Sequence, residues 1–351
     1  MMVENITSDH LNRRLPILDL RNLESIDFAV PVYGYLSPII ICLTVFTKSF
    51  ACVVLLQKNM RSPTNLLLAG MAISDMCTGL CPLPLYIYFY SFGNFMEKVP
   101  INWCGVHFYF GQCIPTIFHT ISIWLTTTLA IQRYKHVCRP LNVRVRENNT
   151  MRKTVFCIVI IFIMAVISHL ACFIDIDITE VDVPSNIHLN STIKTCSVAI
   201  NQWLLDYQDI YYNVYFWFRA IFIQITPCIV LIVLNILLIT KIKKSNNRRR
   251  QMTSQHRSNG SNTGTRTNIM LVIIVGIFLV TELPMSIVMI MNTFDNTFEH
   301  ISILSKREYA VIILLSNFFI RLSFPVNFFI YCGMSKQFRE TFEKTIKCHV
   351  D

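Results

Sequence analysis

Seven long apolar stretches are the feature of this sequence that most restricts its fold. A helix needs about 20 mostly apolar residues to cross a membrane, because the segment must satisfy its own backbone hydrogen bonds there. Only 15% of the residues are charged and the mean hydropathy is +0.48, whereas about 25% is usual for a soluble domain. We therefore predict an all-α membrane protein, a seven-helix bundle over residues 31–57, 64–90, 105–134, 154–175, 210–240, 267–292 and 308–332.

The basic residues are concentrated on one side of this predicted bundle. The formal net charge is +10, and 20 of the 31 Lys and Arg residues fall in the four segments between or after alternate apolar stretches. Short loops rich in Lys and Arg stay in the cytoplasm. We therefore expect a multi-pass plasma-membrane protein with its N-terminus outside. The distribution of the basic residues indicates how the bundle is oriented and which side can contact anionic membrane lipid. A role in nucleic-acid binding is not expected.

This topology divides the chain into three parts. An extracellular tail covers residues 1–30, a membrane domain covers residues 31–332, and a cytoplasmic segment covers residues 333–351. Within the membrane domain, a third cytoplasmic loop is expected over about residues 241–266. Its composition of Asn, Ser, Gly and Arg is typical of a disordered linker.

The C-terminal segment is predicted to form an amphipathic helix on the inner leaflet. Phe338, Phe342 and Ile346 recur every four residues among charged side chains, which is the pattern of a helix that lies in the membrane interface. On the opposite side, Asn5 and Asn190 stand in glycosylation sequons, in segments that we expect outside.

Of the 13 cysteines, only Cys104 and Cys196 fall plainly in segments expected outside, where oxidation is permitted. We predict that they form a disulfide between the outer end of the third helix and the second outer loop. A closed loop of this size is worth about 4–5 kcal/mol in the chain-entropy model. The other cysteines are expected to act mostly as small apolar side chains.

Several short motifs occur in order along the apolar stretches. They are Leu68-Ala69-Gly70-Met71-Ala72-Ile73-Ser74-Asp75, Gln132-Arg133-Tyr134, Pro227, Phe278 with Thr281-Glu282-Leu283-Pro284, and Pro325-Val326-Asn327-Phe328-Phe329-Ile330-Tyr331. Together they resemble the signatures of rhodopsin-like G-protein-coupled receptors, across the whole bundle. The resemblance implies a receptor that has no enzymatic activity and no cofactor. Such a receptor binds a ligand from outside and activates a heterotrimeric G protein.

Departures from the usual motifs narrow the resemblance. Gln132 replaces the acid of the helix-three motif, Glu282 replaces the usual tryptophan, and the helix-seven proline is displaced to Pro325. Together with residues 119–134 and 327–342, these features resemble the sex-peptide and myoinhibitory-peptide receptors of invertebrates. The FMRFamide and myosuppressin receptors share some of them. The resemblance implies a short amidated neuropeptide as ligand and, commonly, an inhibitory G protein.

Lys48 and Asp75 are ionisable residues at membrane depth, where such groups are costly and usually have a partner. In the family, the aspartate that corresponds to Asp75 helps to hold a sodium ion, and Lys48 stands where an asparagine is usual. We hypothesise that Lys48 pairs with Asp75 in place of the ion, which would offset both burial costs. The alternative is that Lys48 reaches toward a membrane interface.

The resemblance also implies the remaining positions of an activation switch. Arg133 is expected at the inner surface, where it meets the G protein, and Gln132 cannot restrain it by charge. Asn327 and Tyr331 are four residues apart, share a helical face, and are expected to line a polar seam with the helix-two carboxylate. Asn235 replaces the tyrosine that usually joins this seam. The set is completed by Tyr134, Phe278 and Pro284.

Spacing from the motifs directs eight side chains toward one space in the outer half of the bundle. Glu282 is expected to pair there with Arg321 or Arg219 until a polar peptide end arrives. Arg and Asn side chains can meet the donor and the acceptor of an amidated C-terminus. A metal site is not expected, because no second His or Cys shares the helical register of His119. The predicted ligand-binding residues are Gln112, Thr116, His119, Arg219, Glu282, Met289, Asn317 and Arg321.

Three alternatives are a retinal protein, a transporter, and a receptor that binds a peptide without signalling. A retinal protein needs a lysine inside the last helix to form a Schiff base, and Arg321 cannot do that chemistry. A transporter usually shows corresponding halves with broken helices, and no internal repeat is visible. A receptor that traps a peptide without signalling remains open, and a G-protein activation assay separates it from the main interpretation.

Overall fold

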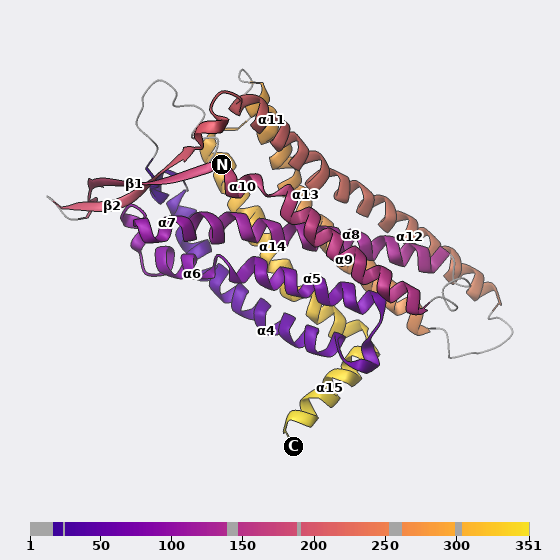
Figure 1. Cartoon of the computed structure of the whole chain (residues 1–351). Coiled ribbons are helices and arrows are strands. Elements are labelled where there is room, and N and C mark those ends of the chain that lie inside the picture. The colour runs from indigo at the N-terminus through magenta and orange to yellow at the C-terminus, as the bar shows by residue number, and fades with distance from the viewer. Residues whose placement is uncertain are drawn as a thin grey trace.

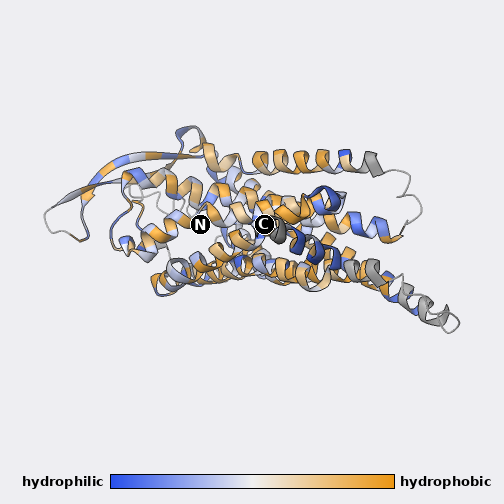
Figure 2. Cartoon of the chain, turned by 90° about the horizontal axis from the view of Figure 1, so that it is seen from below, coloured by the Kyte–Doolittle hydropathy of each residue, from blue (hydrophilic) through white to orange (hydrophobic). Residues whose placement is uncertain are grey.

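Seven helical spans of 18 to 38 residues are long and apolar enough to cross a membrane, within the part of the chain that the computed structural model describes (residues 17–23, 25–138, 147–187, 191–252, 262–298 and 304–350). They lie side by side in one elongated bundle (Figure 1). Hydrophobic residues follow the helices along most of their length, and hydrophilic residues gather in the outer hairpin and the C-terminal helix (Figure 2). The prediction of a seven-helix membrane bundle is confirmed.

Four of the spans contain a π-helical segment as well as α-helix. A π turn inserts one extra residue, which redirects the side chains on either side, and such bulges are frequent at functional sites. In chain order these spans are α3 (Ile26–Ala29) with η1 (Val30–Leu36) and α4 (Ser37–Leu55), α5 (Pro63–Leu80) with α6 (Leu83–Leu85) and η3 (Tyr86–Ser91), α7 (Ile101–Phe108) with η5 (Tyr109–Cys113) and α8 (Ile114–Cys138), and α11 (Gln208–Phe218) with η8 (Arg219–Ile225) and α12 (Thr226–Met252).

The other three spans lie in continuous α-helices. These are α9 (Glu147–Ser168), α13 (Asn262–Thr297) and α14 (Lys306–Met334). A capping box begins α14, in which the Glu308 N–H donates to Ser305 Oγ and the Ser305 N–H donates to the Glu308 carboxylate. The amphipathic helix α15 (Lys336–Val350) follows and turns away from the bundle (Figure 1).

Two helices extend further into the third cytoplasmic loop than the sequence predicts. The linker is predicted over about residues 241–266, but α12 continues to Met252 and α13 begins at Asn262. Lys, Arg and Gln at the end of α12 are good helix formers, whereas the Asn, Thr and Gly residues at the start of α13 are poor ones and do not explain its extension. The hydropathy pattern therefore located the apolar spans but not the ends of the helices that contain them.

The second outer loop adds a β-hairpin to the helical bundle. Strands β1 (Ile176–Pro184) and β2 (Thr192–Ile200) pair antiparallel, with Glu180 opposite Cys196. β-branched residues recur through β1, which is a strand signal that the apolar-stretch analysis did not use. Cys196 is bonded to Cys104 across a Cα–Cα distance of 6.3 Å. The predicted disulfide is thereby confirmed, and it holds the hairpin against α7.

A second disulfide joins Cys113 to Cys172. The expectation that such cysteines act as apolar side chains is wrong for this pair. The fourth span was predicted to reach residue 175, but α9 ends at Ser168 and the chain turns before the short helix α10 (Ala171–Ile174). Cys172 therefore lies beyond the end of the fourth span, on the same side as the hairpin, and not within the membrane.

Part of the predicted N-terminal tail packs onto the bundle. The Leu18 N–H donates to the Cys196 carbonyl at 3.1 Å, and the Leu18 carbonyl accepts from the Val99 N–H at 3.2 Å. Leu18 and Leu20 are 3% and 1% exposed and belong to the core cluster beneath the hairpin. Burial of a leucine side chain is worth roughly 1.5–3 kcal/mol, so the chain from Ile17 onward contributes to the fold.

Asp175 links α10 to the hairpin and is buried there. The Tyr211 hydroxyl donates to Asp175 Oδ1 at 2.9 Å, and the Asn201 N–H donates to the Asp175 carbonyl at 2.8 Å. Burial raises the pKa of Asp175 to about 6, and the hydrogen bond from Tyr211 offsets only part of that effect. Because the folded pKa lies above the ordinary value of 3.8, the contribution of Asp175 to stability is lost as the pH rises through 6.

Asp175→Asn is therefore expected to raise the melting temperature of the detergent-solubilised protein by about 2–4 °C at pH 7.5. At pH 5 the wild-type carboxyl is mostly protonated, so the gain should largely disappear. Thermal melts at the two pH values measure the difference, with Asp177→Asn on exposed β1 as the matched control. An equal gain at both pH values would contradict the assignment.

Candidate functional site

A cavity of about 300 Å³ lies within the bundle toward the hairpin end. Residues from six of the seven spans line it, so it is formed only when the bundle closes. Of the eight predicted ligand-binding residues, seven line this cavity. They are Gln112, Thr116, His119, Arg219, Met289, Asn317 and Arg321.

The four π-helical segments supply much of the cavity wall. Tyr33 comes from η1, Tyr86 from η3, Gln112 from η5, and Arg219 from η8. Each segment therefore directs a polar or aromatic side chain inward at a point where an uninterrupted α-helix would present a different face. These bulges are the local distortions that shape the site.

Arg321 of α14 lies against an aromatic wall from the first two spans. Its Nη2 donates to the Tyr86 hydroxyl at 2.6 Å. Its guanidinium lies 5.1 Å from the Tyr86 ring and 5.7 Å from the Tyr33 ring, and those two rings stack at 4.7 Å. A cation over aromatic rings gains about 0.5–2 kcal/mol, which holds the arginine in place without a carboxylate partner.

A buried acid lies behind His119 of the cavity wall and does not line the cavity itself. Glu282 is 1% exposed, and its Oε1 lies 3.2 Å from His119 Nε2. The prediction that Glu282 pairs with Arg321 or Arg219 is therefore wrong. Arg321 is held by the tyrosines, and Arg219 lies 5.7 Å from the Tyr215 ring on its own helix. Among the residues that the structure describes, no carboxylate therefore forms an ion pair with either arginine of the cavity.

The predicted partnership between Lys48 and Asp75 is present. Lys48 Nζ donates to Asp75 Oδ2 at 2.5 Å, and Ser122 Oγ donates to Asp75 Oδ1 at 2.6 Å. The two charged side chains are only 4% and 3% exposed. Both carboxylate oxygens are therefore occupied by groups of the protein, and the Lys48 ammonium stands where a cation would bind. This geometry excludes the alternative that Lys48 reaches toward an interface.

Side chains of α8 contact both the cavity and the buried ion pair. His119 and Ser122 are three residues apart and so lie on neighbouring positions of one helical face. His119 contacts Glu282 behind the cavity wall, and Ser122 contacts Asp75 one turn further inward. A ligand that moves His119 therefore acts on the same face of α8 that holds the buried ion pair.

Comparison with known proteins identifies the family. The family model described as serpentine type 7TM GPCR chemoreceptor Srw matches residues 35–349. The chain is also 36% identical over 327 residues to the sex peptide receptor of Drosophila melanogaster, which covers 91% of this chain and 73% of that receptor. This chain is a G-protein-coupled receptor. It belongs to a family of receptors and not of enzymes.

Two further relatives define the neighbourhood of the receptor. Sex peptide receptor-related protein 2 of Caenorhabditis elegans is 34% identical over 337 residues, covering 94% of this chain and 73% of the relative. The FMRFamide receptor of Drosophila melanogaster is 27% identical over 319 residues, covering 89% and 53%. The resemblance to the sex-peptide receptor group, with the FMRFamide receptors as neighbours, is thereby confirmed.

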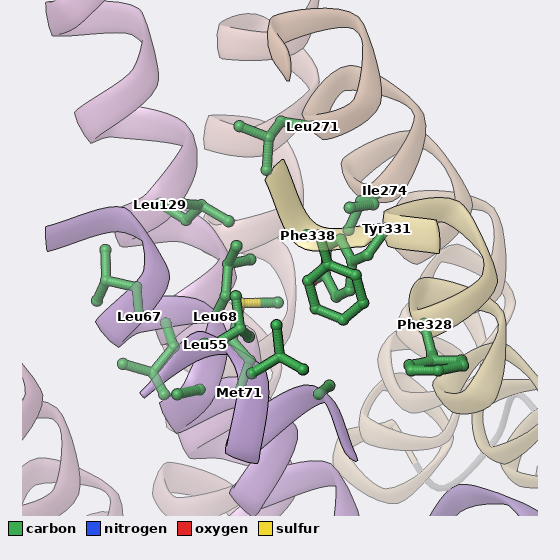
Figure 3. Packing of buried hydrophobic residues seen from close by; sticks show 14 of the residues in the cluster. Leu55, Leu67, Leu68, Met71, Leu129, Leu271, Ile274, Phe328, Tyr331 and Phe338 are labelled. Carbon is green, nitrogen blue, oxygen red and sulfur yellow. The ribbon is translucent and has the colours of Figure 1, made fainter. Parts of the chain in front are cut away.

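The end of the receptor opposite the hairpin is closed by apolar side chains. Leu129, Leu271, Ile274 and Tyr331 belong to one buried cluster (Figure 3). Tyr331 is predicted to line a polar seam with Asp75, but its ring packs in this cluster, 5.7 Å from the ring of Phe338. The turn from α14 into α15 brings Phe338 under the bundle, which the sequence pattern did not indicate. Asn327, one turn before Tyr331, is half-buried.

Gln132 and Arg133 lie at the closed end of α8. Both amide atoms of Gln132 and the Nε of Arg133 are buried without a hydrogen-bond partner among the described residues. No hydrogen bond therefore joins the two side chains at these atoms, as expected for a helix-three motif that lacks its acid. Tyr134, the third residue of the motif, is half-buried.

The other predicted switch residues lie between α12 and α13 or on their outer faces. Asn235 Nδ2 donates to the Val272 carbonyl at 3.5 Å, which is a weak bond. Phe278 packs against the cluster that contains Leu231 and Leu279. Pro284 lies inside α13 with its side chain exposed on the surface of the bundle.

Sequence reasoning missed three kinds of contributor to the site. Tyr33 and Tyr86 form the aromatic wall, His169 bonds Thr120 at 2.8 Å behind the cavity, and Cys113 is oxidised. The tyrosines carried a usable signal, because an uncompensated membrane arginine such as Arg321 requires either a carboxylate or an aromatic face.

Proposed function

We propose that the receptor is activated at the cell surface by a short extracellular neuropeptide with an amidated C-terminus. Two of its relatives are named as receptors for peptides, sex peptide and FMRFamide. The cavity supports the same class of ligand, because aromatic side chains from the first two spans and arginines from the fifth and seventh spans line it. We further propose that the G protein is of the inhibitory class, as the family resemblance implies.

Two buried polar atoms without hydrogen-bond partners support the amidation, one on Arg321 in the cavity wall and one on Glu282 behind His119. Arg321 Nη1 is a donor and Glu282 Oε2 is an acceptor, and neither has a hydrogen-bond partner in the described structure. Leaving such a group unsatisfied costs about 1–3 kcal/mol. A primary amide offers both an N–H donor and a carbonyl acceptor, whereas a free carboxylate offers acceptors only and would be repelled by Glu282.

Matched pairs of peptides test this proposal. Each candidate, drawn from myoinhibitory-type and RFamide-type sequences, is applied as the amide and as the free acid to cells expressing the receptor with a promiscuous G protein. The amide of the active peptide is expected to be about tenfold or more potent than its acid, since one hydrogen bond to a charged group is worth 1.5–3 kcal/mol. Equal potency would contradict the role of the unpaired donor and acceptor.

The same cells also test the class of G protein and whether peptide binding leads to signalling. An active peptide should lower forskolin-stimulated cyclic AMP, and pertussis toxin should abolish that effect if the G protein is of the inhibitory class. Peptide binding without any G-protein activation would favour the alternative of a receptor that traps its ligand.

We also propose that the hairpin end is extracellular and that the end carrying α15 faces the cytoplasm. The Cys104–Cys196 disulfide lies at the hairpin end, and disulfides persist in the oxidising exterior. This orientation makes the chain before Ile26, where the first span begins, extracellular, whereas a tail over residues 1–30 was predicted. It also brings α15 to anionic lipid of the inner leaflet. The sequons at Asn5 and Asn190 lie outside the described residues, and their glycosylation stays a prediction.

A further inference from the structure

The second disulfide joins a distorted segment of the third span to the outer end of the fourth. Cys113 is the last residue of η5 and is 1% exposed, and Cys172 lies on α10 at a Cα–Cα distance of 6.0 Å. Cys172 follows the end of the fourth span and precedes the hairpin. The pair is thus separate from Cys104–Cys196, roughly two and a half helical turns further along the third span.

Two more contacts join the same elements. The ring of Tyr109, at the start of η5, stacks on Phe173 with centroids 5.5 Å apart and planes within 4°. The Thr120 hydroxyl lies 2.8 Å from His169 Nε2 at the point where the fourth span ends. The third span is therefore held to α10 at both ends of its π segment. About two helical turns further inward, it is also held to the chain turn at His169.

The other side of the same π segment forms cavity wall. Gly111 and Gln112 lie between Tyr109 and Cys113 and line the cavity. A methyl group at Gly111 would stand 3.0 Å from Leu85 Cδ1 of the second span, so the backbone of η5 is packed closely there. With Cys113 bonded to α10 on one side and Gly111 against Leu85 on the other, the segment has little room to turn.

We propose that the Cys113–Cys172 disulfide positions the ligand cavity, because it holds η5 in the π conformation that directs Gln112 inward. A π-helical turn is rare, and contacts with neighbouring elements hold this one in place. Without the disulfide, η5 relaxes toward regular α-helix, and each residue gained or lost in a helix turns the side chains beyond it by roughly 100°. Cys113 and Cys172 are thus positioning residues of the binding site.

The test measures where Gln112 points, without any agonist. Gln112→Cys is introduced into the full-length receptor with the disulfide intact and into the Cys113→Ala/Cys172→Ala background. The new thiol is then labelled on intact cells with a negatively charged, membrane-impermeant methanethiosulfonate reagent. Removal of both cysteines prevents the new thiol from pairing with either. Because a turn of roughly 100° removes residue 112 from the cavity, its labelling rate should fall about fivefold or more.

Asn317→Cys in the same two backgrounds is the matched control. Asn317 lines the cavity from α14, away from η5, so its labelling rate should stay within about twofold if the bundle itself is intact. An unchanged rate at residue 112 would overturn the proposal. Equal losses at residues 112 and 317 would also overturn it, since they would indicate general disruption of the cavity.

A second measurement covers the case in which the double alanine variant fails to reach the surface. Non-reducing digestion of the wild-type receptor, followed by mass spectrometry, should recover Cys113 and Cys172 in one cross-linked peptide. Recovery of both as alkylated free thiols would refute the disulfide and the proposal with it. The inference rests on the proposed function only in naming the cavity a ligand site, so absence of a peptide agonist would leave both measurements interpretable.

Discussion

Replacement of Lys48 by methionine is expected to reduce the folded receptor at the cell surface by about tenfold or more. Asp75 would keep only the bond from Ser122, and its charge would remain buried without a counter-ion. Breaking a buried ion pair by removal of one partner costs about 3–5 kcal/mol. Surface labelling and ligand-free thermal melts measure the loss, with Lys58→Met on the exposed cytoplasmic turn as the matched control.

A variant that also changes Asp75 separates the effect of the buried charge from the effect of side-chain packing. Lys48→Met combined with Asp75→Asn removes both charges, and replacement of a whole buried pair by uncharged side chains is often nearly neutral. Most of the lost surface expression should therefore return in the double variant. A double variant as poor as the single one would show that Lys48 contributes through packing and not through its charge.

The same pair predicts how the receptor responds to sodium. Because the Lys48 ammonium is paired with the Asp75 carboxylate, exchange of sodium for a large organic cation should leave the agonist affinity of the wild type unchanged. Lys48→Asn restores the residue that is usual in the family and opens room for an ion, so sodium should weaken agonist binding in that variant alone. A sodium effect in the wild type would contradict the internal counter-ion.

Arg321→Gln is expected to lower agonist potency by about 10- to 100-fold at matched surface expression, together with a loss of stability of about 0.5–2 kcal/mol from the contacts with the tyrosine rings. Its Nη1 is the unpaired donor beside the cavity, and a hydrogen bond from a charged group is worth about 1.5–3 kcal/mol. Arg321→Lys keeps the charge but loses the planar fork, and should lose an intermediate amount.

Arg307→Gln provides the control for this prediction. Arg307 lies on the same helix, is exposed, and forms an ion pair with the exposed Asp27 at 3.4 Å. An exposed pair of this kind contributes little, so its removal should change potency by less than about threefold. Equal effects at positions 307 and 321 would indicate general steering of the peptide and not a specific bond in the cavity.

Some site contacts were predictable because they depend on residues that motifs already place. Asp75 belongs to a helix-two motif, Lys48 falls on a family position of helix one, and a membrane ammonium needs a partner. Glu282 was predicted to meet Arg321 or Arg219 and meets His119 instead, and these three side chains lie on three different helices. Which of them it meets depends on the rotation of each helix about its own axis, and hydropathy does not specify that rotation to within one side chain.

The sequence by itself determined the seven spans and the Cys104–Cys196 disulfide. Helix length and compartment chemistry are local properties of the chain. The tertiary structure alone decided that His119 meets Glu282, that Cys113 is bonded to Cys172, and that the tail docks from Ile17. These contacts join segments far apart in sequence, and the π turns that precede several of them shift the helical register by an extra residue. The residue spacing on which sequence patterns rely therefore does not carry across those turns.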